Sequence, residues 1–225
     1  MEQRNTPEFI LEAFADPNSV RDVVRGILHT IFFHRFFPSI LPQTREVLDL
    51  TLPYVPDVEL ETLIEQRTAA LVRQLDAERS QHQHPAQAPQ TQSQQYLPLQ
   101  RQQQRQHHHQ AGASSGSGRG QVVVHFFERR RRKPGWNPLR GEEEVCWETW
   151  TVKVTVAEPK TESERAKVRR AMESTLLATV MKILAYVNTH KDHIPPITTT
   201  ESNPFPYQIN INQKELGWAA RMGIY

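Results

Sequence analysis

The sequence lacks the features of secreted, membrane-spanning and nucleic-acid-coating proteins. A single cysteine, Cys146, excludes an intramolecular disulfide. No apolar run approaches the roughly 20 residues that cross a bilayer, and no signal-peptide hydrophobic segment follows Met1. The net charge of +2 is too small for a surface that binds nucleic acid over its whole extent. We therefore expect a soluble, cytoplasmic or nuclear protein with no nucleic-acid partner.

Large apolar side chains are nearly absent from one internal tract. Residues 81–110 contain thirteen Gln and five of the ten His. Such a segment cannot bury enough surface to offset its ordering entropy. Residues 112–120, rich in Ser and Gly, have the composition of a flexible linker. We expect one domain in two sequence parts, residues 1–79 and 121–225, separated by a disordered insertion at 80–120.

Apolar periodicity outside this tract predicts an α+β protein. Apolar residues recur at helical spacing over 19–37, 57–79 and 161–188. Ser19, Asp57 and Thr161 stand at the helix starts as N-caps, and Glu164 completes a capping box with Thr161. Strands are expected at 8–14, 47–55, 122–127, 145–157 and 207–211.

The strand at 145–157 has a strict alternation that assigns its two faces. The apolar face is expected to point to the core, with Trp150, Val152, Val154 and Val156. The opposite face is expected to carry Trp147, Thr149, Thr151, Lys153 and Thr155.

Catalytic and metal-binding patterns are missing. The sequence has no Gly-rich phosphate loop, no GxSxG motif and no acidic cluster of metal-binding spacing. Cys146 and His125 form the one thiol and imidazole pair outside the helices. Cys146, however, shares the apolar face of its strand and follows three glutamates, so we expect a buried structural cysteine. No catalytic residue, cofactor or metal is assigned.

The segment KPGWNPLRGEEEV, residues 133–145, follows a basic run and contains a tryptophan without apolar neighbours. Trp136 belongs to no helical or strand pattern, which predicts an exposed loop. Clustered guanidinium groups can bind phosphate, so the basic run is a candidate patch for an acidic membrane surface, ahead of RNA. Its residues are Arg129, Arg130, Arg131, Arg132 and Lys133.

Three motifs, in this order, carry a resemblance to a known family. LHTIFFHR (28–35), HFFERRRRKPGW (125–136) and WETWTVKVTV (147–156), followed by a long helix, resemble the autophagy-related protein 101 family. The resemblance covers roughly residues 9–79 and 121–190. It implies a single HORMA domain, an α+β fold in which three helices pack on an antiparallel sheet.

The resemblance also implies a function. Members of that family are non-catalytic adaptors of the autophagy-initiation kinase complex, act in the cytoplasm at the phagophore assembly site, and pair with the HORMA domain of autophagy-related protein 13. They recruit downstream autophagy factors through a loop with a tryptophan and a phenylalanine. Here the loop is 133–144, Trp136 matches the tryptophan, and Pro138 or Leu139 stands in place of the phenylalanine.

The third helix contributes to dimer faces in HORMA proteins. Its candidate partner-binding residues in this chain are Arg165, Arg169, Arg170, Glu173 and Tyr186. Two alternatives stay open at the level of sequence. One is a HORMA adaptor of the checkpoint or chromosome-axis type, and the other is an RNA- or lipid-binding protein that uses the basic patch.

Overall fold

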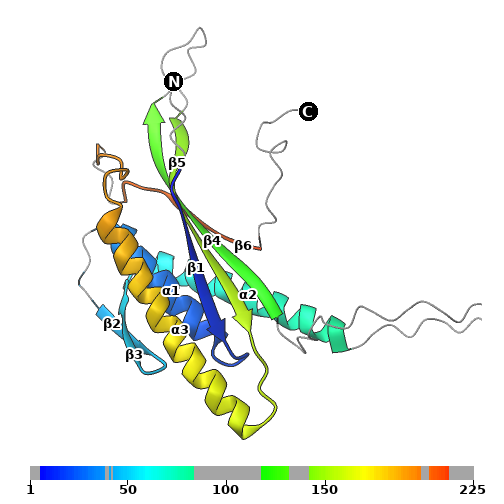
Figure 1. Cartoon of the computed structure of the whole chain (residues 1–225). Coiled ribbons are helices and arrows are strands. Elements are labelled where there is room, and N and C mark those ends of the chain that lie inside the picture. Colours follow the sequence, from blue (N-terminus) through cyan, green and yellow to red (C-terminus); the bar gives the residue numbers. More distant parts are fainter. Residues whose placement is uncertain are drawn as a thin grey trace, which may run out of the picture.

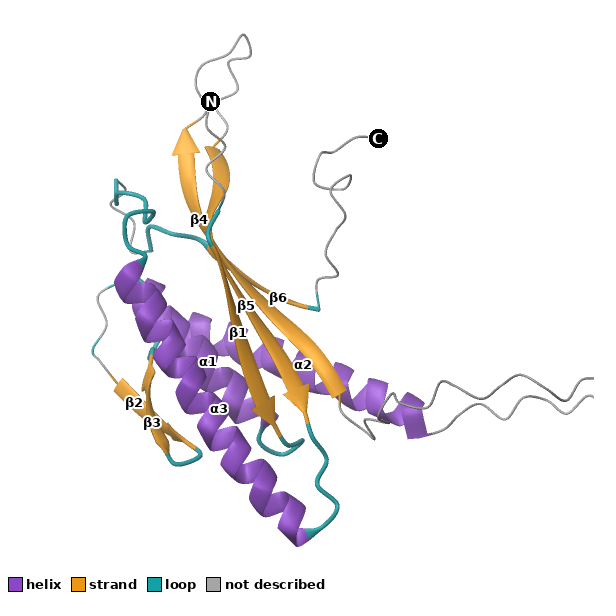
Figure 2. Cartoon of the chain, in the orientation of Figure 1, coloured by secondary structure: helices purple, strands orange, loops and turns teal. Residues whose placement is uncertain are grey.

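A four-stranded sheet with helices on one face forms the body of the molecule. The computed structural model describes residues 6–38, 41, 43–83, 118–131, 142–198 and 203–212. Within them the main sheet has the order β1-β5-β4-β6, and three helices pack against it (Figure 1, Figure 2). The expected α+β class is confirmed. The strands of this sheet are β1 (Glu8–Ala15), β4 (Gly118–Arg131), β5 (Glu142–Val156) and β6 (Tyr207–Ile211).

The sheet is mixed, which corrects the expectation of an antiparallel sheet. β4 pairs antiparallel with β5 and β6, whereas β1 pairs with β5 in parallel. A parallel pair needs a long crossover connection, and here the chain between β1 and β5 includes two of the helices. The alternation of side chains is the same in both strand directions, so the sequence pattern alone did not reveal this pairing.

Apolar residues form continuous rows across the helix-covered face of the sheet. The alternation predicted for β5 is confirmed, because Trp150, Val152, Val154 and Val156 are all buried. The register aligns each of them with buried residues of neighbouring strands. Two of these rows are Phe9–Trp150–Val124–Ile209 and Leu11–Val152–Val122–Ile211.

The helices cover that face in one layer, with α1 (Val20–Arg35) at the centre. Eleven of the 16 residues of α1 are buried, which explains why its sequence is apolar on most sides. α2 (Val58–Gln83) and α3 (Glu162–Thr189) flank it with narrower buried stripes. The expected helices at 19–37, 57–79 and 161–188 are therefore confirmed, with α2 extending to Gln83 and β4 beginning already at Gly118.

Two of the three predicted caps have the expected hydrogen bonds. The Asp57 carboxylate accepts from the Leu60 amide at 2.8 Å, and Thr161 and Glu164 form the capping box. Ser19 occupies the cap position of α1, but its side chain makes no capping bond. The Asp16 carboxylate instead accepts the Ser19 amide at 2.7 Å, so the preceding turn stabilises this helix start.

The strand expected at 47–55 is instead part of a hairpin. β2 (Gln43–Val47) pairs with β3 (Leu50–Tyr54) through a turn at Leu48, which has a φ of 54°. The hairpin covers the side of α1 that faces away from the sheet (Figure 1). It packs closely there, because a Cβ on Gly26 would lie 2.9 Å from Leu52 Cδ1 and 3.2 Å from Val47 Cγ2. Glycine at this position lets the hairpin contact the helix.

A bulge changes the face of one tryptophan. The β4–β5 register shifts between Phe126 and Phe127, so that Phe126 pairs with Glu148 and Phe127 with Cys146. Trp147, expected on the face opposite the core, is therefore buried, at 5.8 Å between ring centroids from Phe126. Cys146, expected in the core, is half-buried.

None of the helices in the described part of the chain has the length and apolar character of a membrane span.

Candidate functional site

The β4–β5 hairpin extends past the rest of the sheet as an arm. β6 pairs with β4 only up to Phe126, and β1 pairs with β5 only from Thr149 onward. We call the segment beyond, Phe127–Arg131 with Glu142–Cys146, the arm; its strands pair with each other (Figure 1). The arm leads directly into and out of residues 132–141. The predicted finger residues Trp136, Pro138 and Leu139, and Arg132 and Lys133 of the basic run, lie outside the described residues.

Opposite charges face each other along the arm. The register places Arg129 opposite Glu144, Arg130 opposite Glu143, and Arg131 opposite Glu142. Arg129 Nε lies 3.8 Å from Glu144 Oε1, and Arg130 forms an ion pair with Glu128. Cross-strand pairs of this kind stabilise a hairpin modestly. They also offset part of the positive charge of Arg129 and Arg130, two of the five residues of the basic run.

A buried carboxylate anchors the arm to the helical layer. Glu148 lies beside the bulge and is fully buried, and Arg35 at the end of α1 donates from Nε to its two oxygens at 2.8 and 3.0 Å. The Trp150 indole donates to the same carboxylate, and His193 Nε2 lies 2.6 Å from Glu148 Oε2. A buried charge needs such partners to offset its desolvation. The network joins β5, α1 and the segment after α3.

Aromatic rings surround this anchor. Trp147 lies 5.2 Å from Phe205 and 5.7 Å from His193, between ring centroids. Phe127 N donates to Pro206 O at 2.8 Å, so the segment before β6 also holds the first residue of the arm. The base of the arm is thus fixed from several sides. We infer a rigid support for the loop that it carries.

Sequence reasoning missed Arg35, Glu148 and His193. The sequence did contain one indication, because Glu148 shares its alternation with Trp150, Val152 and Val154, all assigned to the core. A glutamate on such a face requires a buried cationic partner. Nothing in the spacing of the sequence identified which arginine supplies it, since Arg35 is 113 positions away.

The predicted partner-binding residues of α3 are partly occupied within the molecule. Arg165 forms an ion pair with Glu162 at 3.1 Å, while Arg170 is exposed. The Tyr186 ring stacks on Phe9 at 4.8 Å between centroids, which makes it part of the packing between α3 and β1. Tyr186 is therefore a supporting residue of this face and offers little free surface.

Arg169 bridges α3 to the turn of the β2–β3 hairpin. Its guanidinium donates to Asp49 at 3.3 Å and to Glu173 at 2.8 Å. These hydrogen bonds, first to Asp49 and then to Glu173, raise the pKa of Arg169. The pair is solvent-exposed, so its contribution to stability is small.

An apolar strip runs along the outer side of α3. Leu177 and Met181 are 49% and 56% exposed and lie one helical turn apart. The next residue, Lys182, donates to the backbone oxygen of Ile10 at 2.9 Å, and Thr179 donates to that of Glu12 at 2.6 Å. Both bonds hold α3 against the outer edge of β1. Single exposed apolar side chains are common, but neighbouring ones form a patch of the kind that marks contact surfaces.

Two further predictions concern chemistry. The candidate thiol and imidazole pair lies on neighbouring strands, where His125 Nδ1 and Cys146 Sγ both approach the Thr149 hydroxyl, at 3.1 and 3.6 Å. Within the described ranges no three His, Cys, Asp or Glu side chains gather as metal ligands. His29 is buried against Tyr54, at 4.4 Å between ring centroids, and desolvation lowers its pKa to about 4.

Comparisons with known proteins agree with the resemblance in the motifs. The family model described as autophagy-related protein 101 matches residues 12–201. An autophagy-related protein 101 of Arabidopsis thaliana is 23% identical over 212 residues, covering 85% of this chain and 80% of the relative. Another of Schizosaccharomyces pombe is 22% identical over 200 residues, covering 88% of this chain and 83% of the relative.

Proposed function

Because this chain belongs to the autophagy-related protein 101 family, with a role in autophagy, we propose that it is a non-catalytic adaptor of the autophagy-initiation kinase complex. In this proposal it has a HORMA domain that pairs with the HORMA domain of autophagy-related protein 13. The segment at the end of the arm, residues 132–141, recruits downstream autophagy factors; residues 142–144 of the expected loop belong to β5. It acts in the cytoplasm at the phagophore assembly site.

The observation that carries the recruitment role is the anchored arm. The arm extends past the strands that flank it, and the buried Arg35–Glu148 pair fixes its base. A loop at the end of a rigid support meets a partner without a large loss of conformational entropy. A tryptophan there can bury about 150–250 Å², which is enough for an anchor residue in an interface.

The recruitment role is tested by changing the loop while leaving the domain intact. Replacing Trp136 and Leu139 with Ala is expected to block autophagosome formation in cells while melting temperature and pairing stay unchanged. A control variant, Arg140→Ala, changes the same loop without removing an apolar side chain and should support normal autophagy. A large drop in melting temperature in the double variant would show that these residues belong to the core instead.

The apolar strip of α3 supports the pairing role. Full burial of a Leu or Met side chain is worth about 1.5–3 kcal/mol. Leu177 and Met181 are about half exposed, so their burial by a partner would contribute roughly 1.5–3 kcal/mol together. That corresponds to about 10- to 150-fold in affinity. We assign the centre of the pairing face to these two residues, with Arg165 and Arg170 at its rim.

The pairing face is tested with charge substitutions. Leu177→Asp and Met181→Asp should each weaken binding to the HORMA domain of autophagy-related protein 13 by at least tenfold, measured by titration calorimetry. Val58, at the start of α2, is 78% exposed and provides the matched control, Val58→Asp. Equal affinities for all three variants would show that α3 does not belong to the interface. Circular dichroism melting of each variant checks that the fold is retained.

A further inference from the structure

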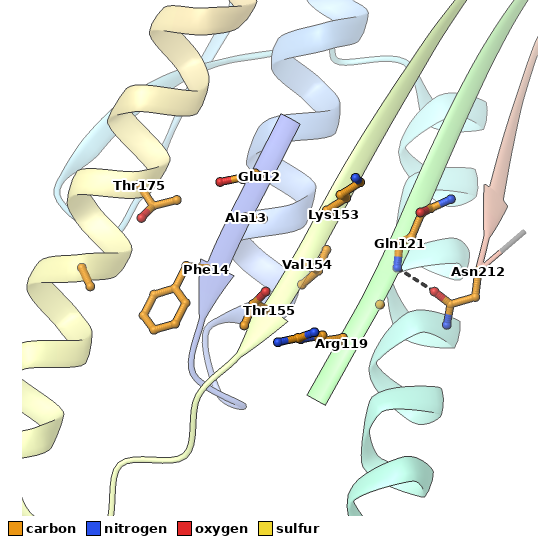
Figure 3. A pocket seen from close by; sticks show the side chains of 12 residues that line it. Glu12, Ala13, Phe14, Arg119, Gln121, Lys153, Val154, Thr155, Thr175 and Asn212 are labelled. Atoms are coloured by element: carbon orange, nitrogen blue, oxygen red, sulfur yellow. Dashed lines mark hydrogen bonds between the residues drawn. The ribbon is translucent and has the colours of Figure 1, made fainter. Parts of the chain in front are cut away.

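The face of the sheet opposite α1 carries a groove that the proposed adaptor role does not use. It has a volume of about 770 Å³. Its floor is formed by β1, β5 and β4, and residues of α3 form one wall (Figure 3). Asn212, just after β6, stands at the other side. A hollow of this size accommodates a side chain together with its neighbours in an extended segment.

Most of the polar side chains in the lining are hydrogen-bond donors. Arg119 and Lys153 both reach into the groove, and within the described residues neither forms an ion pair. The Thr155 and Thr175 hydroxyls also line the groove, and within the described residues neither forms a hydrogen bond. The carboxylate of Glu12 is the single acidic group among the lining residues.

Asn212 adds one more donor. Its Oδ1 accepts from the Gln121 backbone amide at 2.6 Å (Figure 3), and its backbone amide donates to the Gln121 backbone oxygen at 2.8 Å. With Oδ1 turned to the Gln121 amide, the Nδ2 hydrogens are the donors that its side chain can offer the groove. Asn212 has a φ of 44°, a conformation that asparagine tolerates better than most residues.

The sheet register sets the spacing of the charged groups. Arg119 lies opposite Thr155 on β5, and Lys153 is two positions earlier on the same strand. Such diagonal neighbours are about 7–8 Å apart at Cα, a separation over which two long side chains can converge on one anion. Glu12 neighbours Lys153 across the β1–β5 pair. It is therefore farther from the Arg119 side of the groove.

From this arrangement we propose that the groove binds a phosphorylated serine or threonine in an extended segment of a partner protein. A phosphate group carries a charge of about −1.5 to −2 and three acceptor oxygens at neutral pH. Two cations and the neutral donors of Thr155 and Asn212 match that charge and that number of acceptors. A carboxylate, with one charge and two oxygens, would leave donors unpaired.

The shape of the groove favours a protein segment over a membrane. α3 at one side and Asn212 at the other rise beside the floor. A flat bilayer surface cannot descend between them, whereas a single extended segment can. Phe14, half-buried at the β1 side, provides apolar contact for a residue that flanks the phosphate.

The test uses the intact chain and a degenerate peptide library with a fixed phosphoserine and randomised flanking positions. The matched library carries serine instead. Immobilised chain is expected to retain the phosphorylated library about tenfold more strongly. Arg119→Ala and Lys153→Ala should each reduce that retention by about tenfold. Glu12→Gln should increase it by about threefold, because it removes the acidic group from the groove.

The control is Arg73→Ala, which removes one positive charge from the exposed side of α2, outside the groove. Its retention of the phosphorylated library should equal that of the unchanged chain. Equal retention of the two libraries would overturn the proposal, as would unchanged binding by Arg119→Ala. The chain could also bind phosphatidylcholine vesicles that contain phosphatidylinositol phosphate and show no preference for the phosphorylated library. This result would assign the groove to lipid and would refute the proposal. These outcomes do not depend on pairing with autophagy-related protein 13.

Discussion

Replacing Glu148 with leucine tests the anchor at the base of the arm. Glu148 has no exposed surface and Arg35 has a side-chain exposure of 3%. The Glu148→Leu variant therefore leaves a buried arginine without its counter-charge. Breaking a buried ion pair by removing one partner costs about 3–5 kcal/mol. For a chain of this size each kcal/mol lowers the melting temperature by about 2–4 °C, so we expect a decrease of roughly 6–20 °C.

The double variant Arg35→Leu/Glu148→Leu separates the charge effect from packing. Removing both charges also removes the desolvation cost of each, so buried ion pairs often tolerate apolar replacement. The Trp150 indole then loses its acceptor, at a cost of about 1–3 kcal/mol. We expect the double variant to be no less stable than either single variant, measured by urea unfolding followed by circular dichroism.

The ion pair of Arg165 with Glu162 provides a matched control on the surface. Their side chains are 63% and 87% exposed, and Arg165→Leu should change the free energy of unfolding by less than about 0.5 kcal/mol. Two results would refute the reasoning. One is a cost below about 1 kcal/mol for Glu148→Leu, and the other is a double variant whose cost equals the sum of the single ones.

Two further predictions concern the β2–β3 hairpin and its contact with α1. The pKa of His29 is lowered to about 4 in the folded protein. As the pH decreases from about 6.5 to 4, His29 therefore takes up a proton in the unfolded chain but not in the folded protein, and the free energy of unfolding falls. The difference in the free energy of unfolding between pH 7 and pH 4, measured with urea, should be smaller by roughly 3 kcal/mol in His29→Phe. An equal difference in the variant and the unchanged protein would contradict this assignment. Overpacking against Leu52 and Val47 costs Gly26→Ala about 1–3 kcal/mol, and the better helix propensity of Ala returns about 1 kcal/mol. We therefore expect a net loss of stability of up to about 2 kcal/mol, and a raised melting temperature would contradict the close contact between hairpin and helix.

Local rules explain the parts of the fold that the sequence predicted well. The capping groups Asp57 and Thr161 hydrogen-bond to amides only three positions away, so their spacing is visible in the chain. The buried stripe of α3 from Met172 to Val187 follows from helical periodicity in the same way. These features need no knowledge of distant residues.

The features that the sequence did not reveal depend on backbone geometry or on distant partners. The turn at Leu48 requires a positive φ at a leucine, a conformation that leucine rarely adopts, so an uninterrupted strand was the natural expectation. The bulge that buries Trp147 exists only in the pairing of β4 with β5. The direction of β1 is likewise set by a strand 141 positions away, as the register of Phe9 with Trp150 illustrates.

The same distinction between local features and distant partners applies to the candidate site. Motif resemblance predicted Trp136 and α3 as functional regions, and both stay predictions. It gave no information on what holds the loop in place, because the anchor joins Arg35, Glu148 and His193 from three separate segments. The groove at Arg119 was also missed, since its glycine-flanked position in the sequence is typical of a linker although it belongs to β4.

We propose above that this chain pairs with the HORMA domain of autophagy-related protein 13. The most direct measurement is co-expression of the full chain with the autophagy-related protein 13 HORMA domain of the same organism, followed by size-exclusion chromatography with light scattering. We expect a single species with the mass of a one-to-one complex. Separate elution of the two proteins, each at its own mass, would contradict it.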